Sequence, residues 1–301
     1  METDACEIER LPDELLAAVI SLTTPPDACR AAAVSRAFLA AADSDAVWSR
    51  FLPRVLPVFA QGELPCAPPS KKALFHFQRL ADEPALLPCQ LVSMCVDRAT
   101  GAKCYMLSAR ALHISWGDNP NYWAWIKLGC DEIKTNKSFK EAAKLRGVWW
   151  LEIRGKIHSM LLSQNSAYAA YMVFKLADAG FSQLDFPFQE ASISVGGSES
   201  TRQTCLQGYM KVGDDGVPRK HLLVSRTRNL TLLRPRRGAV PLTDDIVLPR
   251  KRADGWMEVE LGEFYNEDGD DGEVSASLME TKGGVWKDGL VVWGIEIRAK
   301  Q

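Results

Sequence analysis

Residues 115–126, SWGDNPNYWAWI, concentrate the side chains of this chain that are best suited to contact another molecule. The twelve positions hold three tryptophans, one tyrosine, two asparagines and one aspartate. Aromatic rings at this density are typical either of a buried segment of the hydrophobic core or of an exposed surface that stacks on a flat ligand. The spacing does not separate these two interpretations, so the elements that position the segment have to be predicted first.

The other reactive side chains form no catalytic or metal-binding pattern. The histidines, His76, His113, His158 and His221, lie in no HExxH motif or triad-like arrangement, and the sequence contains no GxSxG or Walker loop. The eight cysteines are scattered singly without a CxxC pair, so we expect reduced thiols. We predict no catalytic residue, no metal and no cofactor.

Length and charge narrow the class of protein further. The chain has 301 residues, 47% of them hydrophobic, which is enough for two domains with packed cores. Its 36 Lys and Arg nearly balance 38 Asp and Glu, so no overall field attracts it to nucleic acid or to an anionic membrane. The acidic start METDACEIER does not resemble a signal peptide. We expect a soluble protein of the cytoplasm and nucleus.

Composition divides the chain into three regions. Residues 8–52 are rich in Ala and Leu, contain no glycine and show helical spacing, whereas apolar and polar residues alternate from about residue 90 onward. Five prolines between them indicate a linker, and KKALFHFQRLA predicts one bridging helix at 71–81. The predicted domains are therefore 1–53, 54–84 and 85–301.

The first region predicts three short helices. Pro12, followed by two acidic residues, favours the start of the first helix, and Pro25 and Pro26 are expected to stop it. Asp27 is the predicted cap of a second helix with a narrow face of small residues. Asp45 opens the third. Three such helices have little core of their own, so we expect them to dock on the following domain.

An ordered set of motifs in this region resembles an F-box. These are LPDELL, then CR, then VSRAF, and finally DAVW followed by LP, which together span residues 8–53. The resemblance implies a three-helix module that binds the Skp-type adaptor of a cullin-RING ubiquitin ligase. The positions that match its adaptor-binding residues are Leu11, Pro12, Leu15, Ile20, Val34 and Trp48. The other interpretation is an ordinary helical cap on the C-terminal domain.

The last region predicts an antiparallel β-sandwich. GVWWLEIRGKI, AYAAYMVFKL, WMEVELGEF and LVVWGIEIR each alternate between two faces, and turns rich in glycine and asparagine separate them. Trp125 and Trp149 are assigned to its core. Together with the N-terminal helices, these strands predict an α+β chain.

The strand tracts and SWGDNPNYWAW together resemble the phloem protein 2 lectin domain, the family of the Nictaba-type tobacco lectin, over about residues 103–298. The resemblance implies a jelly-roll-like sandwich that binds N-acetylglucosamine oligomers or the core of N-linked glycans. It also implies that Trp116 and Trp123 line the sugar site, that Glu273 and Glu280 bind sugar hydroxyls, and that Trp286 lies nearby. This fits the chemistry, because the C–H face of a pyranose can lie on an indole while its hydroxyls need polar partners. In the alternative interpretation the two tryptophans are core and Glu273 belongs to a solvated acidic loop.

One stretch departs from the family. Residues 182–255 form a long polar segment, interpreted as a loop that extends the site, covers it or binds a protein. A basic run within it is either solvated surface, a nuclear signal or a phosphate patch. The run consists of Arg226, Arg228, Arg234, Arg236 and Arg237.

The resulting hypothesis is a non-catalytic adaptor. The F-box joins a Skp-type adaptor and, through it, a cullin scaffold, while the lectin-like domain selects glycoprotein targets for ubiquitination. Three alternatives stay open: a sugar-independent receptor that binds proteins through 182–255, a soluble lectin whose F-box no longer binds, and a glycosidase. The glycosidase would need Glu273 and Glu280 about 5 to 9.5 Å apart.

Overall fold

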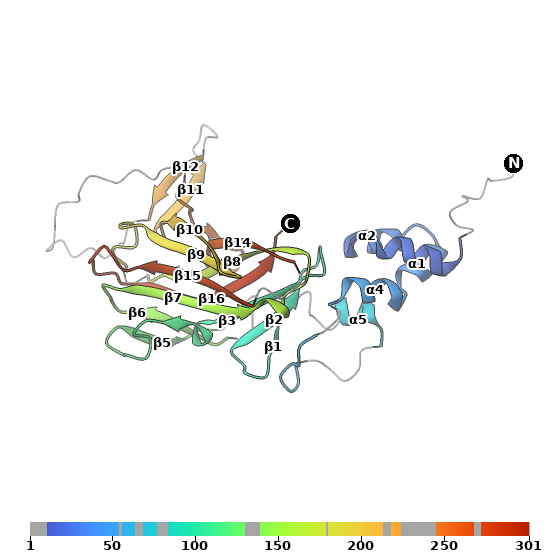
Figure 1. Ribbon diagram of the computed structural model, residues 1–301, viewed down its shortest axis with the longest axis horizontal. Helices are drawn as coiled ribbons and strands as arrows, with labels where there is room; N and C mark the ends of the chain where they lie inside the picture. The colour runs from blue at the N-terminus through green and yellow to red at the C-terminus, as the bar shows by residue number, and fades with distance from the viewer. Residues whose placement is uncertain are drawn as a thin grey trace.

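The structure is a computed structural model that describes residues 11–53, 56–63, 69–76, 84–129, 139–178, 180–212, 218–223, 245–267 and 272–300. Helices come first and strands follow, and the helices lie beside one end of the β-domain (Figure 1). The helices are α1 (Asp13–Ser21), α2 (Pro25–Ala31), α3 (Arg36–Ala42), α4 (Asp45–Phe51) and α5 (Lys71–His76). No helix in the described ranges is long and apolar enough to cross a membrane.

The region predicted to hold three helices contains four, because both of its predicted boundaries were misplaced. Pro25 and Pro26 occupy the first turn of α2, where a missing N–H costs nothing, and the hydroxyl of Thr24 rather than Asp27 accepts the capping bond, from the Asp27 N–H at 3.3 Å. The predicted second helix is interrupted before Ser35, whose hydroxyl caps α3 by accepting from the Phe38 N–H at 3.4 Å.

The helices pack around Trp48 of α4. Its indole is fully buried, donates a hydrogen bond to the Ala42 carbonyl at 2.7 Å, and contacts the rings of Phe51 and Phe75 at centroid distances of 5.5 and 5.1 Å. Phe75 comes from α5, so this helix belongs with the N-terminal helices. Residues 77–81 of the predicted bridging helix lie outside the described residues.

The strands form a nine-stranded sheet, a five-stranded sheet and a separate hairpin, and every pairing between named strands is antiparallel. The strands are β1 (Ala85–Leu86), β2 (Val92–Val96), β3 (Lys103–Ser108), β4 (His113–Ile114), β5 (Trp123–Lys127), β6 (Glu141–Leu145), β7 (Leu151–His158), β8 (Ser166–Leu176), β9 (Gln189–Val195), β10 (Ser198–Thr204), β11 (Gly208–Val212), β12 (Pro218–Leu222), β13 (Arg250–Lys251), β14 (Met257–Asn266), β15 (Glu273–Glu280) and β16 (Leu290–Ala299). The five-stranded sheet has the order β10-β9-β15-β7-β4. The nine-stranded sheet has the order β1-β2-β3-β16-β8-β14-β13. In addition, β6 pairs with β16, and β5 pairs with β6.

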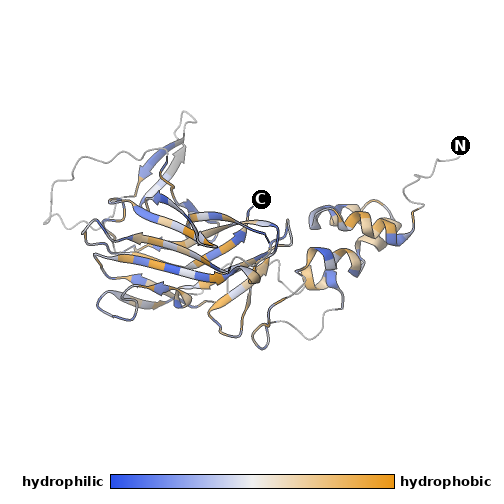
Figure 2. Ribbon diagram, in the orientation of Figure 1, coloured by the Kyte–Doolittle hydropathy of each residue, from blue (hydrophilic) through white to orange (hydrophobic). Residues whose placement is uncertain are grey.

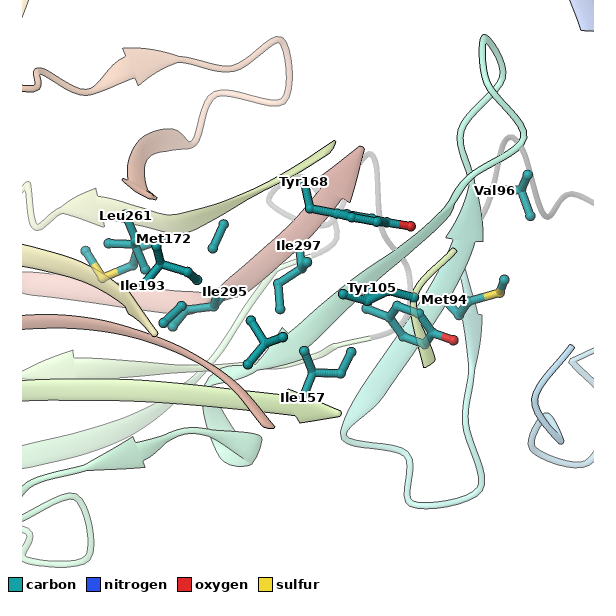
Figure 3. Close-up of a cluster of buried hydrophobic side chains, with 14 of the residues drawn as sticks. Met94, Val96, Tyr105, Ile157, Tyr168, Met172, Ile193, Leu261, Ile295 and Ile297 are labelled. Atoms are coloured by element: carbon teal, nitrogen blue, oxygen red, sulfur yellow. The ribbon is translucent and has the colours of Figure 1, made fainter. Parts of the chain in front are cut away.

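The two large sheets face each other across one hydrophobic core. Ile157 and Ile193 from the five-stranded sheet point toward Met172, Ile295 and Ile297 from the other (Figure 3). Hydrophobic and hydrophilic residues alternate along several of these strands, as expected when one face is buried (Figure 2). The predicted α+β class, helices followed by an antiparallel sandwich, is confirmed.

The segment 182–255 is not one long loop. It supplies β9, which sits inside the five-stranded sheet between β10 and β15, and the separate hairpin of β11 and β12. Ile193 of β9 is a core residue, and the hydroxyls of Ser192 and Ser277 share a buried hydrogen bond of 2.8 Å. A strand with one buried and one exposed face alternates apolar and polar residues. This alternation explains why the segment 182–255 is rich in polar residues. The five arginines of the basic run, from Arg226 to Arg237, lie outside the described residues.

The helices meet the sandwich at the turn between β2 and β3. Gly101 has φ +76°, and a Cβ there would lie 2.1 Å from the Phe51 carbonyl oxygen at the end of α4. Only glycine fits this close approach. The end of β7 lies nearby, because the Tyr105 hydroxyl on β3 donates to the Leu161 carbonyl at 3.0 Å. The start of β7 is consequently at the opposite end of the sandwich, away from the helices (Figure 1).

Candidate binding sites

A strained turn holds Trp116 in solvent at the end of β4. Trp116 has φ +64°, in the left-handed region that costs a bulky residue about 1 to 2 kcal/mol. Hydrogen bonds on either side fix the turn, from the Gly117 N–H to the Ile114 carbonyl and from the Asn119 N–H to the Trp116 carbonyl, both 2.9 Å. The side chain is nevertheless 59% exposed. A large exposed ring on a turn that is fixed in this way is available for contact with another molecule.

Trp116 lines an open hollow of about 890 Å³. Its wall is formed by residues 113–120 together with Trp150, which directly precedes β7, and Glu152, which lies at the start of β7. Trp150 is 50% exposed, and Tyr122 supports Trp116 from the side at a ring distance of 5.9 Å. The hollow thus offers exposed rings and carboxylate, amide and imidazole groups at its edges.

Glu152 organises the polar part of the hollow. Its carboxylate accepts hydrogen bonds from the Trp150 indole at 3.1 Å, the Ser115 hydroxyl at 3.0 Å and the Arg154 guanidinium at 3.2 Å. The bond from Trp150 is the main reason why the pKa of Glu152 is lowered, with further lowering from Ser115, Arg154 and His113 against a smaller opposing effect of burial. Glu152 therefore stays ionised at neutral pH and fixes the orientation of Trp150.

A second pair of exposed tryptophans lies beside the hollow. Trp149 is 58% exposed and meets the 38% exposed Trp286 edge to face, with ring centroids 4.5 Å apart. The sequence-based assignment of Trp149 to the core is therefore wrong, because the residue precedes β7 and its side chain is outside both sheets. Trp125 does pack half-buried against the core, with the Arg110 guanidinium 3.6 Å from its ring centroid.

The N-terminal helices expose a surface of a different kind, made of aliphatic side chains. We call it the helical apolar surface, and it consists of Leu11, Leu15, Val19, Leu22, Val34 and Leu39. Pro12 is exposed next to Leu11. The other two predicted contact residues, Ile20 and Trp48, are buried inside the helices. They stabilise the module from within and do not lie on this surface.

Comparisons with known proteins fit both halves of this architecture. The F-box-like family matches residues 8–54, and the phloem protein 2 family matches residues 102–299. The chain belongs to the phloem protein 2 family. It is similar over nearly its whole length to F-box protein PP2-B1 of Arabidopsis thaliana, with 36% identity covering 99% of this chain and 92% of the relative.

Other relatives of this F-box phloem protein 2 chain share the same arrangement. F-box protein PP2-B10 of Arabidopsis thaliana is 35% identical over 99% of the chain and 96% of its own length. F-box protein SKIP3 of the same plant is 34% identical over 97% and 88%. Both resemblances expected from the sequence, to the F-box and to phloem protein 2, are therefore confirmed.

Trp123 does not share the hollow with Trp116 in this phloem protein 2 domain. It is 2% exposed at the start of β5, and its indole donates to the Ser115 carbonyl at 3.2 Å. Trp123 thereby fixes the strained turn from beneath. The family resemblance implied that both tryptophans line the sugar site, but in the structure Trp116 is exposed and Trp123 is buried.

Glu280 is buried as well. On β15 it follows the inward-facing Val274, Ala276 and Leu278 at intervals of two, and it forms an ion pair with the fully buried Lys287. Its carboxylate also accepts from the backbone N–H groups of Lys282 at 3.1 Å and Gly283 at 2.6 Å. These partners occupy it internally, so a direct contact with a sugar hydroxyl is not open to it in this structure.

Glu273 lies at the other end of the same strand. It is exposed, pairs with Lys156 at 2.7 Å, and stands opposite His158 in the β15–β7 register. Glu273 and Glu280 are seven positions apart on β15, which corresponds to about 23 Å at roughly 3.3 Å per residue, and an odd spacing puts the two side chains on opposite faces. The two carboxylates are therefore much too far apart for the glycosidase geometry considered from the sequence. Glu273 is also remote from Trp116.

Trp150 and Glu152 are not among the site residues predicted from the sequence. Both stand on the outward face of WWLEIR, where alternation alone marks them as solvated strand residues. The pairing of β4 with β7, in which His113 lies opposite Arg154, brings them to the Trp116 turn. That pairing joins positions about 40 residues apart in the chain, and no local sequence pattern predicts it.

Proposed function

We propose that this F-box phloem protein 2 chain is the substrate-recognition subunit of a Skp–cullin–F-box ubiquitin ligase. In this proposal the helical apolar surface binds a Skp-type adaptor and, through it, a cullin. The hollow around Trp116 binds N-acetylglucosamine-containing or N-linked glycans of the target proteins. The chain contributes proximity rather than a catalytic group, since tethering raises the effective concentration of the target near the ubiquitin-charged enzyme.

The chemistry of the helical apolar surface supports the adaptor half. The six aliphatic side chains that define it are all solvent-exposed in the described structure. Leu15 and Val19 stand four residues apart on α1 and so share one face of that helix. Exposed apolar residues grouped on short helices are typical of a surface that another protein covers.

The hollow supports the glycan half, and its central observation is the exposed, strained Trp116 opposite Trp150. A pyranose can lie with its C–H face against these indoles. Its hydroxyls then meet the ionised Glu152 and the polar groups of Asp118 and Asn119 at the rim. Charged acceptors form the stronger hydrogen bonds with hydroxyl groups, so this combination favours sugars over purely apolar ligands.

The placement of the two surfaces supports their joint use. The F-box helices contact the turn between β2 and β3, whereas the hollow lies at the start of β7, at the far end of the sandwich (Figure 1). An adaptor on the helices therefore leaves the hollow free for a glycan. A bridging subunit requires this separation.

The glycan half is tested by calorimetric titration of the full chain with chitotriose and with a high-mannose glycan. Saturable binding to at least one of them, lost in Trp116→Ala, is expected. Tyr265→Ala is the matched control, because it removes an exposed aromatic ring on β14 and should bind as the wild type does. Absence of binding by the folded wild-type protein would exclude the glycan role for these ligands and favour a receptor that recognises protein surfaces.

A further inference from the structure

The Trp149–Trp286 pair stands beside the hollow but does not line it. Resting on the proposed glycan role of the hollow, we propose that this pair forms a second sugar subsite, so that the rim binds a linear oligosaccharide across both tryptophan pairs. One pyranose lies in the Trp116 hollow, and the following rings pass over Trp149 and Trp286. The rim is defined here as Trp116, Trp150, Trp149 and Trp286.

Two connections join the Trp149–Trp286 pair to Trp116 and Trp150. Trp149 and Trp150 are consecutive, and Trp150 is a wall of the hollow. On the other side, the Tyr122 carbonyl accepts from the Gly147 N–H at 3.3 Å, and a Cβ on Gly147 would lie 2.1 Å from the Trp286 ring. Tyr122 in turn contacts Trp116. Trp149 and Trp286 are thus neighbours of Trp116 and Trp150 both along the chain and through Tyr122 and Gly147.

A buried ion pair supports Trp149 and Trp286 from beneath. The fully buried Lys287 ammonium donates to the Trp149 carbonyl at 2.8 Å and to the Val285 carbonyl at 3.0 Å, and it is ion-paired with buried Glu280. Backbone bonds between Val148 and Lys287, of 2.8 and 3.0 Å, join the same two segments. This buried ion pair, whose ammonium also donates to two backbone carbonyls, joins the segments that carry both indoles. Glu280 is therefore a positioning residue of the rim.

The indoles of the rim follow one another across adjacent strand ends. Trp286 follows β15, Trp149 and Trp150 precede β7, and Trp116 follows β4, and these strands are adjacent in the order β15-β7-β4. Neighbouring strands lie about 4.8 Å apart, so the indoles extend across the strand ends over roughly 10 Å. This arrangement suits an extended ligand that crosses several strand ends, and a single sugar ring would leave part of it uncovered.

The test measures how affinity depends on ligand length. The full chain is titrated with N-acetylglucosamine and with its dimer, trimer and tetramer, in the wild type, Trp149→Ala, Trp116→Ala and Tyr265→Ala. Affinity is expected to rise with length in the wild type and in Tyr265→Ala. Trp149→Ala should weaken the tetramer by about tenfold while leaving the monomer unchanged, and Trp116→Ala should weaken every ligand.

The outcomes separate the two proposals. Wild-type binding with the same length dependence in Trp149→Ala would overturn the second subsite and leave the proposed glycan role intact. Absence of binding to every oligomer by the folded wild type would overturn both for this class of sugar. Trp149 is exposed, so the alanine variant should fold, and Trp149→Phe should recover part of the tetramer affinity if an aromatic surface is what the ligand requires.

Discussion

The helical apolar surface and the rim are both exposed and hydrophobic, yet they are built in opposite ways. The first consists of aliphatic side chains on short helices that rest on the apolar core around Trp48. The second consists of indoles at strand ends, with Glu152 beside them and the buried Lys287–Glu280 pair underneath. Aliphatic surface without fixed charges fits the apolar face of another protein, whereas indoles with an ionised acceptor fit a ligand that has both C–H faces and hydroxyls.

The largest effect on stability should follow from breaking the Lys287–Glu280 ion pair beneath the rim. Lys287→Met leaves the Glu280 carboxylate buried without its cation, which we expect to destabilise the sandwich by about 3 to 5 kcal/mol. Unfolding by urea, followed by tryptophan fluorescence, measures this loss. Adding Glu280→Leu should restore much of the stability, because removing both charges also removes the desolvation cost. A single variant as stable as the wild type would contradict the buried ion pair.

Binding through the helical apolar surface should be weakened by charged side chains introduced on that surface. Leu15→Asp combined with Val19→Asp places two carboxylates on the exposed face of α1, and we expect affinity for a Skp-type adaptor to fall by about a hundredfold. Surface plasmon resonance on immobilised adaptor measures the change. Glycan binding by the same variant should be unaltered. A parallel loss of glycan binding would show that the two surfaces are not independent.

Low pH should affect the stability of the β-sandwich and of the F-box helices differently. Burial alone would raise the pKa of Glu258 on β14, but hydrogen bonds and charges from Arg298, Arg250 and Arg252 outweigh it and lower the pKa to about 2. A lowered pKa in the folded state means that this contribution to stability is full above the ordinary value of 4.5 and is lost as the pH falls toward 2.

The F-box ion pairs are more exposed, as in Arg30 with Asp27, so they should contribute little at any pH. Glu258→Gln is therefore expected to be less stable than the wild type at neutral pH, with the difference shrinking below pH 4.5. Denaturant titrations at several pH values measure it. A constant difference down to pH 2 would contradict the assigned role of Glu258.

The smallest expected change in stability concerns Trp116 itself. Trp116→Gly relieves the left-handed strain but increases the entropy lost on folding, so the free energy of unfolding should change by no more than about 1 kcal/mol. Trp123→Ala, by contrast, should cost about 3 to 5 kcal/mol, because it empties a core position. Thermal unfolding of both variants tests the contrast. Equal losses would mean that Trp116 is a core residue after all.

Local patterns predicted the fold well, since helices, alternating strands and the antiparallel sandwich follow from spacing within each segment. The site was harder to predict. Trp116 and Trp123 have the same side chain in one short segment, and only the backbone of the turn decides which ring is exposed. Glu152 enters the site through the pairing of β4 with β7, which no short stretch of sequence encodes.

One part of the site could have been deduced from the strand pattern. Glu273 and Glu280 stand an odd number of positions apart in EVSASLME, which forms β15, and the two-residue alternation of a strand puts them on opposite faces. The same reasoning could have shown that 182–255 contains strands, since ASISV alternates within it. The placement of the Lys287 ammonium beneath Trp149 depends on long-range packing and could not have been predicted.

The central claim is that one chain joins a ligase adaptor to a glycan. Its most direct test is to capture the full chain on immobilised Skp-type adaptor and to measure retention of an N-glycosylated protein before and after enzymatic removal of its glycans. We expect retention that disappears on deglycosylation and in Trp116→Ala but persists in Tyr265→Ala. Retention that survives deglycosylation would contradict it and identify a receptor that recognises the protein surface itself.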